Sequence, residues 1–97
     1  MKIIKEAIAG TLESSDLLVK VAPSADATLE VIIKSEVIKQ FGVQIRRVVD
    51  ETLAKLDVTA GSFLIEDKGA LDCAIRARVQ TAILRAAGCD ELDWRKL

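Results

Sequence analysis

Residues 28–56 read TLEVIIKSEVIKQFGVQIRRVVDETLAKL, and within this stretch the spacing of the apolar side chains changes. At its start they alternate, with Leu29, Val31 and Ile33 on one face, which is typical of a strand with one buried side. Over residues 36–56 they recur every three or four positions, which is typical of a helix with one apolar face. The stretch therefore predicts a strand followed closely by a long helix.

The helix predicted at 36–56 has about five to six turns, and Ser35 directly before it is expected to cap its N-terminus. Its apolar stripe consists of Ile38, Phe41, Ile45, Val48, Val49, Thr52, Leu53 and Leu56. On the opposite side, Arg46 with Asp50 forms an i,i+4 pair of opposite charge. Such a pair is worth only about 0.2–0.5 kcal/mol, so the stripe decides the helix.

Further elements are predicted on both sides of this stretch. Before it, residues 6–13 are rich in small, strand-compatible residues, and residues 16–22 alternate between apolar and other side chains. After it, residues 62–67 form a fourth predicted strand. A second helix is predicted over residues 70–87, where Gly88 is expected to end it. Its apolar stripe is Leu71, Ile75, Val79, Ala82, Ile83 and Ala86.

The predicted order, with the strand at 28–34 in third place, is strand, strand, strand, helix, strand, helix. This order predicts an α+β fold in which both helices cover one face of a four-stranded, mainly antiparallel sheet. No repeat or linker divides the chain, so residues 1–97 are expected to form a single domain. Residues 89–97 are expected to be a loose C-terminal tail, which Trp94 could anchor.

The composition excludes several classes of function. The 14 basic and 15 acidic residues are mixed along the chain, without the concentrated basic surface of a nucleic-acid binder. No apolar run has the ~20 residues of a membrane helix and no signal-peptide pattern is present, so a cytoplasmic location is expected. There is no histidine, which excludes the Ser-His-Asp and Cys-His arrangements and most zinc sites. Cys73 and Cys89 are too few for a disulfide framework. We therefore expect neither a catalytic nor a metal site.

The serine pair Ser14-Ser15 lies between the first two predicted strands and has the length of a tight hairpin turn. A serine at such a tip is exposed, as the attachment point of a swinging prosthetic group must be. Tethering would raise the local concentration of the attached group, which is the advantage of a carrier. Serine also favours turns for conformational reasons alone, and on spacing alone this simpler interpretation is favoured.

Two segments indicate a family. The sequence AGTLESSD at residues 9–16 and the sequence DKGALDCAIRAR at residues 67–78 resemble the citrate lyase acyl carrier protein, the gamma subunit of that complex. The likeness covers nearly the whole chain, including its length and the order of its elements. It implies that Ser14 holds a phosphoribosyl-dephospho-coenzyme A group through a phosphodiester. The family tolerates glycine after the modified serine, which favours Ser14 over Ser15.

The resemblance also implies a function and partners. The thiol of the arm would hold acetyl and citryl thioesters while citrate is cleaved to acetate and oxaloacetate in citrate fermentation. The citrate lyase alpha subunit would act as acyl transferase and the beta subunit as lyase, and a separate prosthetic-group transferase would load Ser14. The chain itself would be a non-catalytic carrier that contributes position and reach, with neither nucleic acid nor membrane as a partner.

Three alternatives stay open from the sequence. One is the acyl carrier of malonate decarboxylase, which uses a similar arm on a related small subunit. Another is a small protein-interaction module whose serine turn is never modified. The third is an enzyme built from Asp, Glu and Lys, against which the missing histidine counts.

Three other features of the second predicted helix could have a function. Arg78 lies at the edge of its apolar stripe, so its stem is expected to be buried and its head solvated. The alternatives for Arg78 are a buried salt bridge, or a contact with a partner subunit or with the phosphates of the arm. Cys73, Ala77 and Leu84 line the far side, where packing against the first helix is favoured over a docking face. Neither cysteine has a neighbourhood that indicates a catalytic thiolate.

The third feature is a group of carboxylates, Glu66, Asp67 and Asp72, near the start of this helix. Three carboxylates could bind a cation. Acidic residues near a helix N-terminus are also ordinary partners of the helix dipole, and this second interpretation is favoured.

Overall fold

The structure is a computed structural model that describes residues 1–88, so the tail predicted at residues 89–97, with Trp94, lies outside the described residues. Its elements in chain order are β1 (Ala7–Gly10), β2 (Leu17–Ala22), β3 (Leu29–Ser35), α1 (Ile38–Lys55), β4 (Gly61–Asp67) and α2 (Asp72–Ala86). This order confirms the predicted α+β fold with four strands and two helices. No helix within residues 1–88 is long and apolar enough to cross a membrane.

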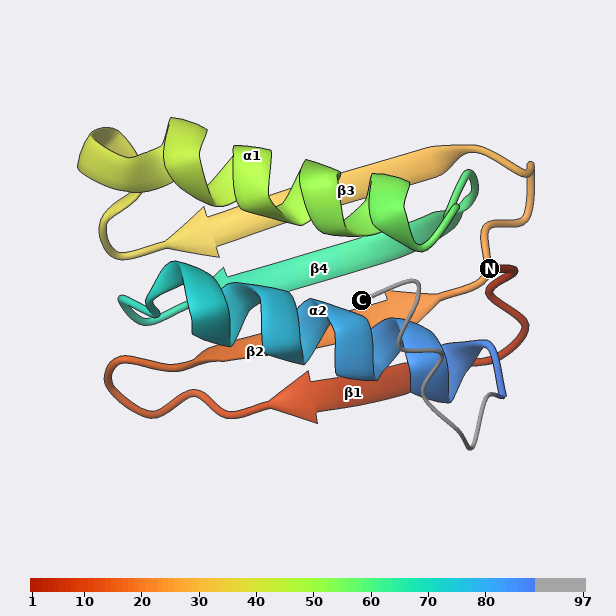
Figure 1. Ribbon diagram of the computed structural model, residues 1–97, viewed down its shortest axis with the longest axis horizontal. Helices are drawn as coiled ribbons and strands as arrows, with labels where there is room; N and C mark the ends of the chain where they lie inside the picture. Colours follow the sequence, from red (N-terminus) through yellow and green to blue (C-terminus); the bar gives the residue numbers. More distant parts are fainter. Residues whose placement is uncertain (89–97) are drawn as a thin grey trace.

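The four strands form one mixed sheet in the order β1-β2-β4-β3 (Figure 1). The pairs β1–β2 and β2–β4 are antiparallel, whereas β3 and β4 pair in parallel from Leu29 with Gly61 to Ser35 with Asp67. The parallel pair arises because α1 connects β3 to β4, and a helical crossover returns the chain to the end of the sheet from which the first strand started. β4, the last strand in the sequence, therefore lies inside the sheet between β2 and β3.

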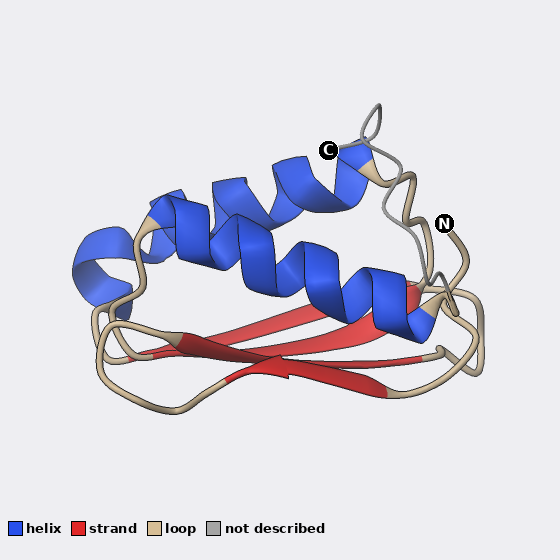
Figure 2. Cartoon of the chain, turned by 60° about the horizontal axis from the view of Figure 1, so that its bottom comes forward, coloured by secondary structure: helices blue, strands red, loops and turns tan. Residues whose placement is uncertain are grey.

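Both helices lie on the same face of the sheet, as predicted (Figure 2). The core fills the space between the two layers and includes Leu17, Val19, Phe63, Ile65, Val49, Ile75, Val79 and Ile83, all of which are at most 1% exposed. The alternation predicted for residues 16–22 is confirmed, since Leu17, Val19 and Val21 point into this core. The opposite face of the sheet is not covered by any described element, and Ile8 and Ile32 are exposed there.

The predicted apolar stripes are wrong at the first turn of each helix. Ile38 and Phe41 are 43% and 47% exposed, and Leu71 is 74% exposed. Figure 1 shows why for α1: its first turn extends past the end of β3, so no strand lies beneath it. Leu71 directly precedes the first residue of α2 and follows the loop after β4. The apolar spacing in the sequence continues into these turns, but the buried core does not extend that far.

The cap predicted for Ser35 is also wrong, because Val37 occupies the N-cap position of α1 and makes no capping side-chain bond. The Ser35 hydroxyl instead accepts a hydrogen bond from the backbone N–H of Val37 and donates one to Asp67 on β4. The helix consequently begins at Ile38, two residues later than predicted.

At the C-terminal end of α2, Gly88 has a φ of 72°, the left-handed conformation expected after a helix C-terminus.

Candidate functional site

The candidate serines lie in the loop 11–16 between β1 and β2. The loop is longer than the predicted two-residue hairpin, because β1 ends at Gly10. Both Ser14 and Ser15 are exposed. Among the described residues, the hydroxyl of Ser14 has no hydrogen-bond partner. The side chain of Ser14 is therefore accessible to another protein.

The loop is held to the neighbouring loop by its backbone. The N–H of Ser15 donates to the carbonyl of Lys68 at 2.8 Å, and the N–H of Lys68 donates to the carbonyl of Asp16 at 2.9 Å. These two bonds continue the antiparallel pairing of β2 with β4 beyond the strand ends. Ser15 adopts a φ of 64°, which turns the chain at this point. Ser14 is thus one residue from a fixed backbone position.

The second fixed point of the loop is the carboxylate of Asp16. The guanidinium of Arg78 on α2 donates two hydrogen bonds to it, from Nε at 3.2 Å and from Nη2 at 3.0 Å. The Thr11 hydroxyl and the N–H of Leu17 also donate to it, both at 2.8 Å. The bonds from Arg78, followed by those from Thr11 and Leu17, lower the pKa of Asp16 to about 2. The carboxylate is therefore charged at neutral pH.

This ion pair bears on one interpretation of Arg78, the buried salt bridge. The side chain of Asp16 is 18% exposed and that of Arg78 is 42% exposed. The salt bridge is present, although it is half exposed rather than buried. Its geometry ties α2 to the loop that contains the serines, two residues after Ser14.

Gly10 makes the close approach of loop and helix possible. A Cβ at Gly10 would lie 1.9 Å from the carbonyl oxygen of Leu17 and 3.3 Å from Cδ of Arg78. Its φ of 94° also favours glycine. The glycine at this point of the sequence AGTLESSD is explained by close packing and backbone conformation.

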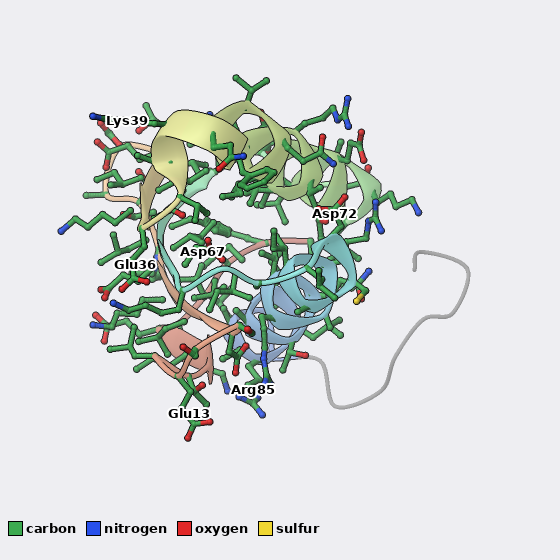
Figure 3. The ribbon with its side chains drawn as sticks, turned by 90° about the vertical axis from the view of Figure 1, so that its left-hand side faces the viewer. Glu13, Glu36, Lys39, Asp67, Asp72 and Arg85 are labelled. Carbon is green, nitrogen blue, oxygen red and sulfur yellow. The ribbon has the colours of Figure 1, made fainter. Side chains whose placement is uncertain are left out.

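Asp67 at the end of β4 joins the remaining loops at this end of the sheet. It is 2% exposed, and its carboxylate accepts hydrogen bonds from the Ser35 hydroxyl at 2.8 Å and from the N–H groups of Gly69 and Ala70 at 3.1 and 2.9 Å. A buried carboxylate is tolerated when it is fully hydrogen-bonded in this way. Figure 3 looks onto this end, with Asp67 near the centre and with Glu13 and Lys39 at opposite edges.

The three carboxylates considered for a cation are not brought together. Asp67 points into the protein, whereas Glu66, the residue before it in β4, points to the opposite face and is half-buried. Asp72 accepts a hydrogen bond from the Gln44 amide at 2.7 Å. Within residues 1–88 no group of three or more potential ligands is close enough to hold a metal ion. The interpretation of these residues as structural groups fits their contacts.

A groove opens between the first turns of the two helices. Its volume is about 710 Å³, and its lining consists of Val37, Phe41, Gln44, Ile45, Asp67, Gly69, Ala70, Leu71, Asp72, Cys73, Ile75 and Arg76. The groove includes the exposed Cys73. The packing predicted for Cys73 and Ala77 is wrong, because both are exposed, whereas Leu84 is buried as predicted.

Sequence analysis missed the role of Thr11 and the formation of this groove. Thr11 and Asp16 both lie within the segment 9–16, and the only signal for their hydrogen bond in the sequence is that two polar residues lie five positions apart. The groove could not be foreseen, because Phe41 and Leu71 continue the apolar periodicity of the core. The segments 9–16 and 67–78 are hydrogen-bonded to each other, a relationship that only the three-dimensional structure shows.

The structure is thus a small α+β fold with exposed serines on a loop whose backbone and Asp16 side chain are held by neighbouring residues. Residues 4–86 match the family model described as "Malonate decarboxylase delta subunit (MdcD)". The whole chain is 65% identical to the citrate lyase acyl carrier protein of Albidiferax ferrireducens, over 99% of that protein. It is 63% identical to the protein of the same name from Pectobacterium atrosepticum and 52% identical to "Citrate lyase acyl carrier protein 2" of Salmonella typhimurium, each over its full length.

The chain therefore belongs to the citrate lyase acyl carrier protein family. The name of these relatives describes a carrier rather than a catalyst. The family predicted from the two sequence segments is confirmed.

Proposed function

We propose that this chain is the acyl carrier subunit of a citrate lyase and that Ser14 is its attachment site. The observation that supports this assignment most directly is the accessible hydroxyl of Ser14, which has no hydrogen-bond partner within residues 1–88 and lies on a loop held at Ser15 and Asp16. Full-length relatives with the name citrate lyase acyl carrier protein support the same role.

The group proposed for Ser14 is phosphoribosyl-dephospho-coenzyme A, joined through a phosphodiester. When bound, it supplies a thiol that forms acyl thioesters. The site fits such a group, because nothing among the described residues covers Ser14 and no side chain competes for its oxygen. The chain's own residues hold the root of the arm in place: Asp16 and Arg78 fix the loop on one side, and Lys68 fixes it on the other.

The proposed partners are the citrate lyase alpha subunit as acyl transferase, the beta subunit as lyase, and a transferase that loads the prosthetic group. A serine at the end of the sheet leaves the helices and most of the sheet away from the attachment point. Partner proteins can therefore approach Ser14 without rearrangement of the core. The cytoplasm is the compartment that such a complex would occupy.

The test is an intact mass of the protein co-expressed with its loading enzymes, followed by peptide mapping. We expect a gain equal to one phosphoribosyl-dephospho-coenzyme A group on the peptide that contains Ser14. The gain should be absent in Ser14→Ala and present in Ser15→Ala, which is a matched control because both serines are exposed on the same loop. An unmodified mass in the presence of active loading enzymes would leave an unmodified interaction module as the better account.

A second candidate is the acyl carrier of malonate decarboxylase, because the matching family model bears the name of that enzyme's delta subunit. The two candidates differ in their partners. Capture of the loaded chain by purified citrate lyase alpha and beta subunits, without capture by malonate decarboxylase subunits, would support the first. The opposite pattern would support the second.

A further inference from the structure

The groove between the first turns of α1 and α2 lies at the same end of the sheet as the loop 11–16. Its lining includes Gly69, the residue that follows Lys68, whose carbonyl accepts the hydrogen bond of Ser15. From backbone spacings, Ser14 is within roughly 13 Å of this wall. A group attached to Ser14 therefore enters the groove at a high effective concentration, without needing affinity for it as a free ligand.

The size and lining of the groove are those of a small-molecule site. Ligand sites commonly have volumes of roughly 300–1,000 Å³ and an apolar lining with few polar groups, and this groove has about 710 Å³. Phe41 is 47% exposed and Leu71 is 74% exposed, so two large apolar side chains remain accessible to solvent.

The polar groups of the groove are of two kinds. The carboxylates are already engaged, since Asp67 accepts three hydrogen bonds and Asp72 binds the amide of Gln44. Arg76, in contrast, is exposed and makes no ion pair or hydrogen bond with the described residues. The groove thus combines an aromatic ring with a free cation, which complements a group made of a base and phosphates.

We propose that this groove holds the adenosine part of the prosthetic group, with the base against Phe41 and a phosphate near Arg76. The inference rests on the attachment at Ser14 proposed above. The phosphodiester joins the arm through its phosphoribosyl unit, so the nucleoside lies near the root and the thiol at the far end. With the root held in the groove, only the pantetheine part swings.

The test compares loaded and unloaded protein by NMR, with the protein labelled and the arm unlabelled. We expect chemical-shift changes at Phe41, Leu71 and Arg76 on loading, and NOEs between the adenine protons and the ring of Phe41. In Phe41→Ala the chemical-shift changes at Leu71 and Arg76 should disappear while the mass gain at Ser14 remains. Phe41→Leu keeps an apolar side chain at this position and therefore controls for a folding defect caused by Phe41→Ala. Val43→Ala is the matched control, because Val43 is 89% exposed on the same helix and does not line the groove.

A second readout is the rate at which a phosphodiesterase cleaves the arm of the loaded protein. Stacking of the base on an aromatic side chain would protect the arm from the enzyme. The rate of cleavage should therefore be higher in Phe41→Ala than in Val43→Ala, by roughly fivefold or more. Shift changes confined to residues 13–16 on loading would overturn the inference and leave the carrier role intact. Shifts at the groove that occur only when a partner subunit is added would overturn it in favour of a protein occupant. A chain that is never loaded would remove the proposed function and this inference with it.

Discussion

The guanidinium of Arg78 and the carboxylate of Asp16 are joined by two hydrogen bonds of 3.2 and 3.0 Å although 62 residues separate them in the chain. The contact connects α2 with the loop that bears the candidate serine. A paired guanidinium and carboxylate fix both distance and orientation, which a single ammonium cannot do. We therefore propose Arg78 as a positioning residue for the candidate serine Ser14, acting through Asp16.

Replacement of Arg78 by Lys should slow loading more than it unfolds the protein. The pair is half exposed, so we expect a stability loss of about 1 kcal/mol or less in urea titration. The loop would lose its fixed orientation, and kcat/KM of the prosthetic-group transferase should fall roughly threefold or more, with a larger fall in Arg78→Ala. The matched control is Arg46→Lys, which alters an ion pair on the outside of α1. Unchanged loading and stability in Arg78→Lys would refute the positioning role.

The same pair predicts the response to acid. The bonds from Arg78, Thr11 and Leu17 lower the pKa of Asp16 from 3.8 to about 2, so the unfolded chain binds the proton more readily than the folded protein. The stabilisation is complete above pH 4 and is lost as the pH falls towards 2. After allowance for solvent exposure of Arg78, its size is about 1 kcal/mol. Free energies of unfolding at pH 5 and pH 2.5 should therefore differ less in Asp16→Asn than in the unmodified protein; an identical difference would contradict the prediction.

Gly10 and Gly69 allow backbone strain to be separated from close packing. Both have positive φ, 94° and 89°, but a Cβ at Gly10 would meet the carbonyl oxygen of Leu17 at 1.9 Å, whereas nothing lies within 4 Å of a Cβ at Gly69. Gly69→Ala should cost about 1 kcal/mol from the left-handed conformation. Gly10→Ala should cost about 3 kcal/mol, because the loop must also move. Urea denaturation of both variants checks this, and equal losses would show that the close approach is unimportant.

Removal of the Asp67 carboxylate should be among the more destabilising changes at this end of the sheet. Asp67→Ala would leave three donors, the Ser35 hydroxyl and the N–H groups of Gly69 and Ala70, without their buried acceptor. We expect a loss of about 2–4 kcal/mol in thermal or urea unfolding. Glu66→Gln, at the adjacent half-buried position, should change stability by less than about 0.5 kcal/mol. A comparable effect of the two substitutions would be contrary to this account.

Ser15 offers a test of which serine is free to change. Its φ of 64° is unfavourable for most side chains but easy for glycine, so Ser15→Gly should leave stability unchanged or raise it by a few tenths of a kcal/mol. Loading at Ser14 should persist in this variant, whereas Ser15→Val should lower the melting temperature because a β-branched residue resists this conformation. Differential scanning calorimetry with intact mass gives both readouts, and loss of loading in Ser15→Gly would point to Ser15 as a participant.

The sequence allowed the elements and the family to be predicted, because the alternation in β2 and the helical spacing of α1 are both strong and agree with their burial. It did not reveal that β3 and β4 pair in parallel, since pairing partners are chosen by tertiary packing and not by periodicity. Phe41 was wrongly assigned to the core for the same reason: the apolar stripe of a helix does not indicate where the sheet beneath it ends. Among the site residues, Ser14 and Arg78 could be proposed separately, but the link through Asp16 depends on the fold.

The position of β4 in the sheet has a consequence for how the protein is made. Residues 61–67 pair on one side with β2 and on the other with β3, so they form the seam between two otherwise separate pieces. Until the ribosome has released this segment, β2 and β3 each expose an unpaired edge, and such edges favour aggregation. Folding must therefore wait for long-range pairing late in synthesis, and fragments that end before residue 61 should be captured by chaperones rather than accumulate as partly folded domains.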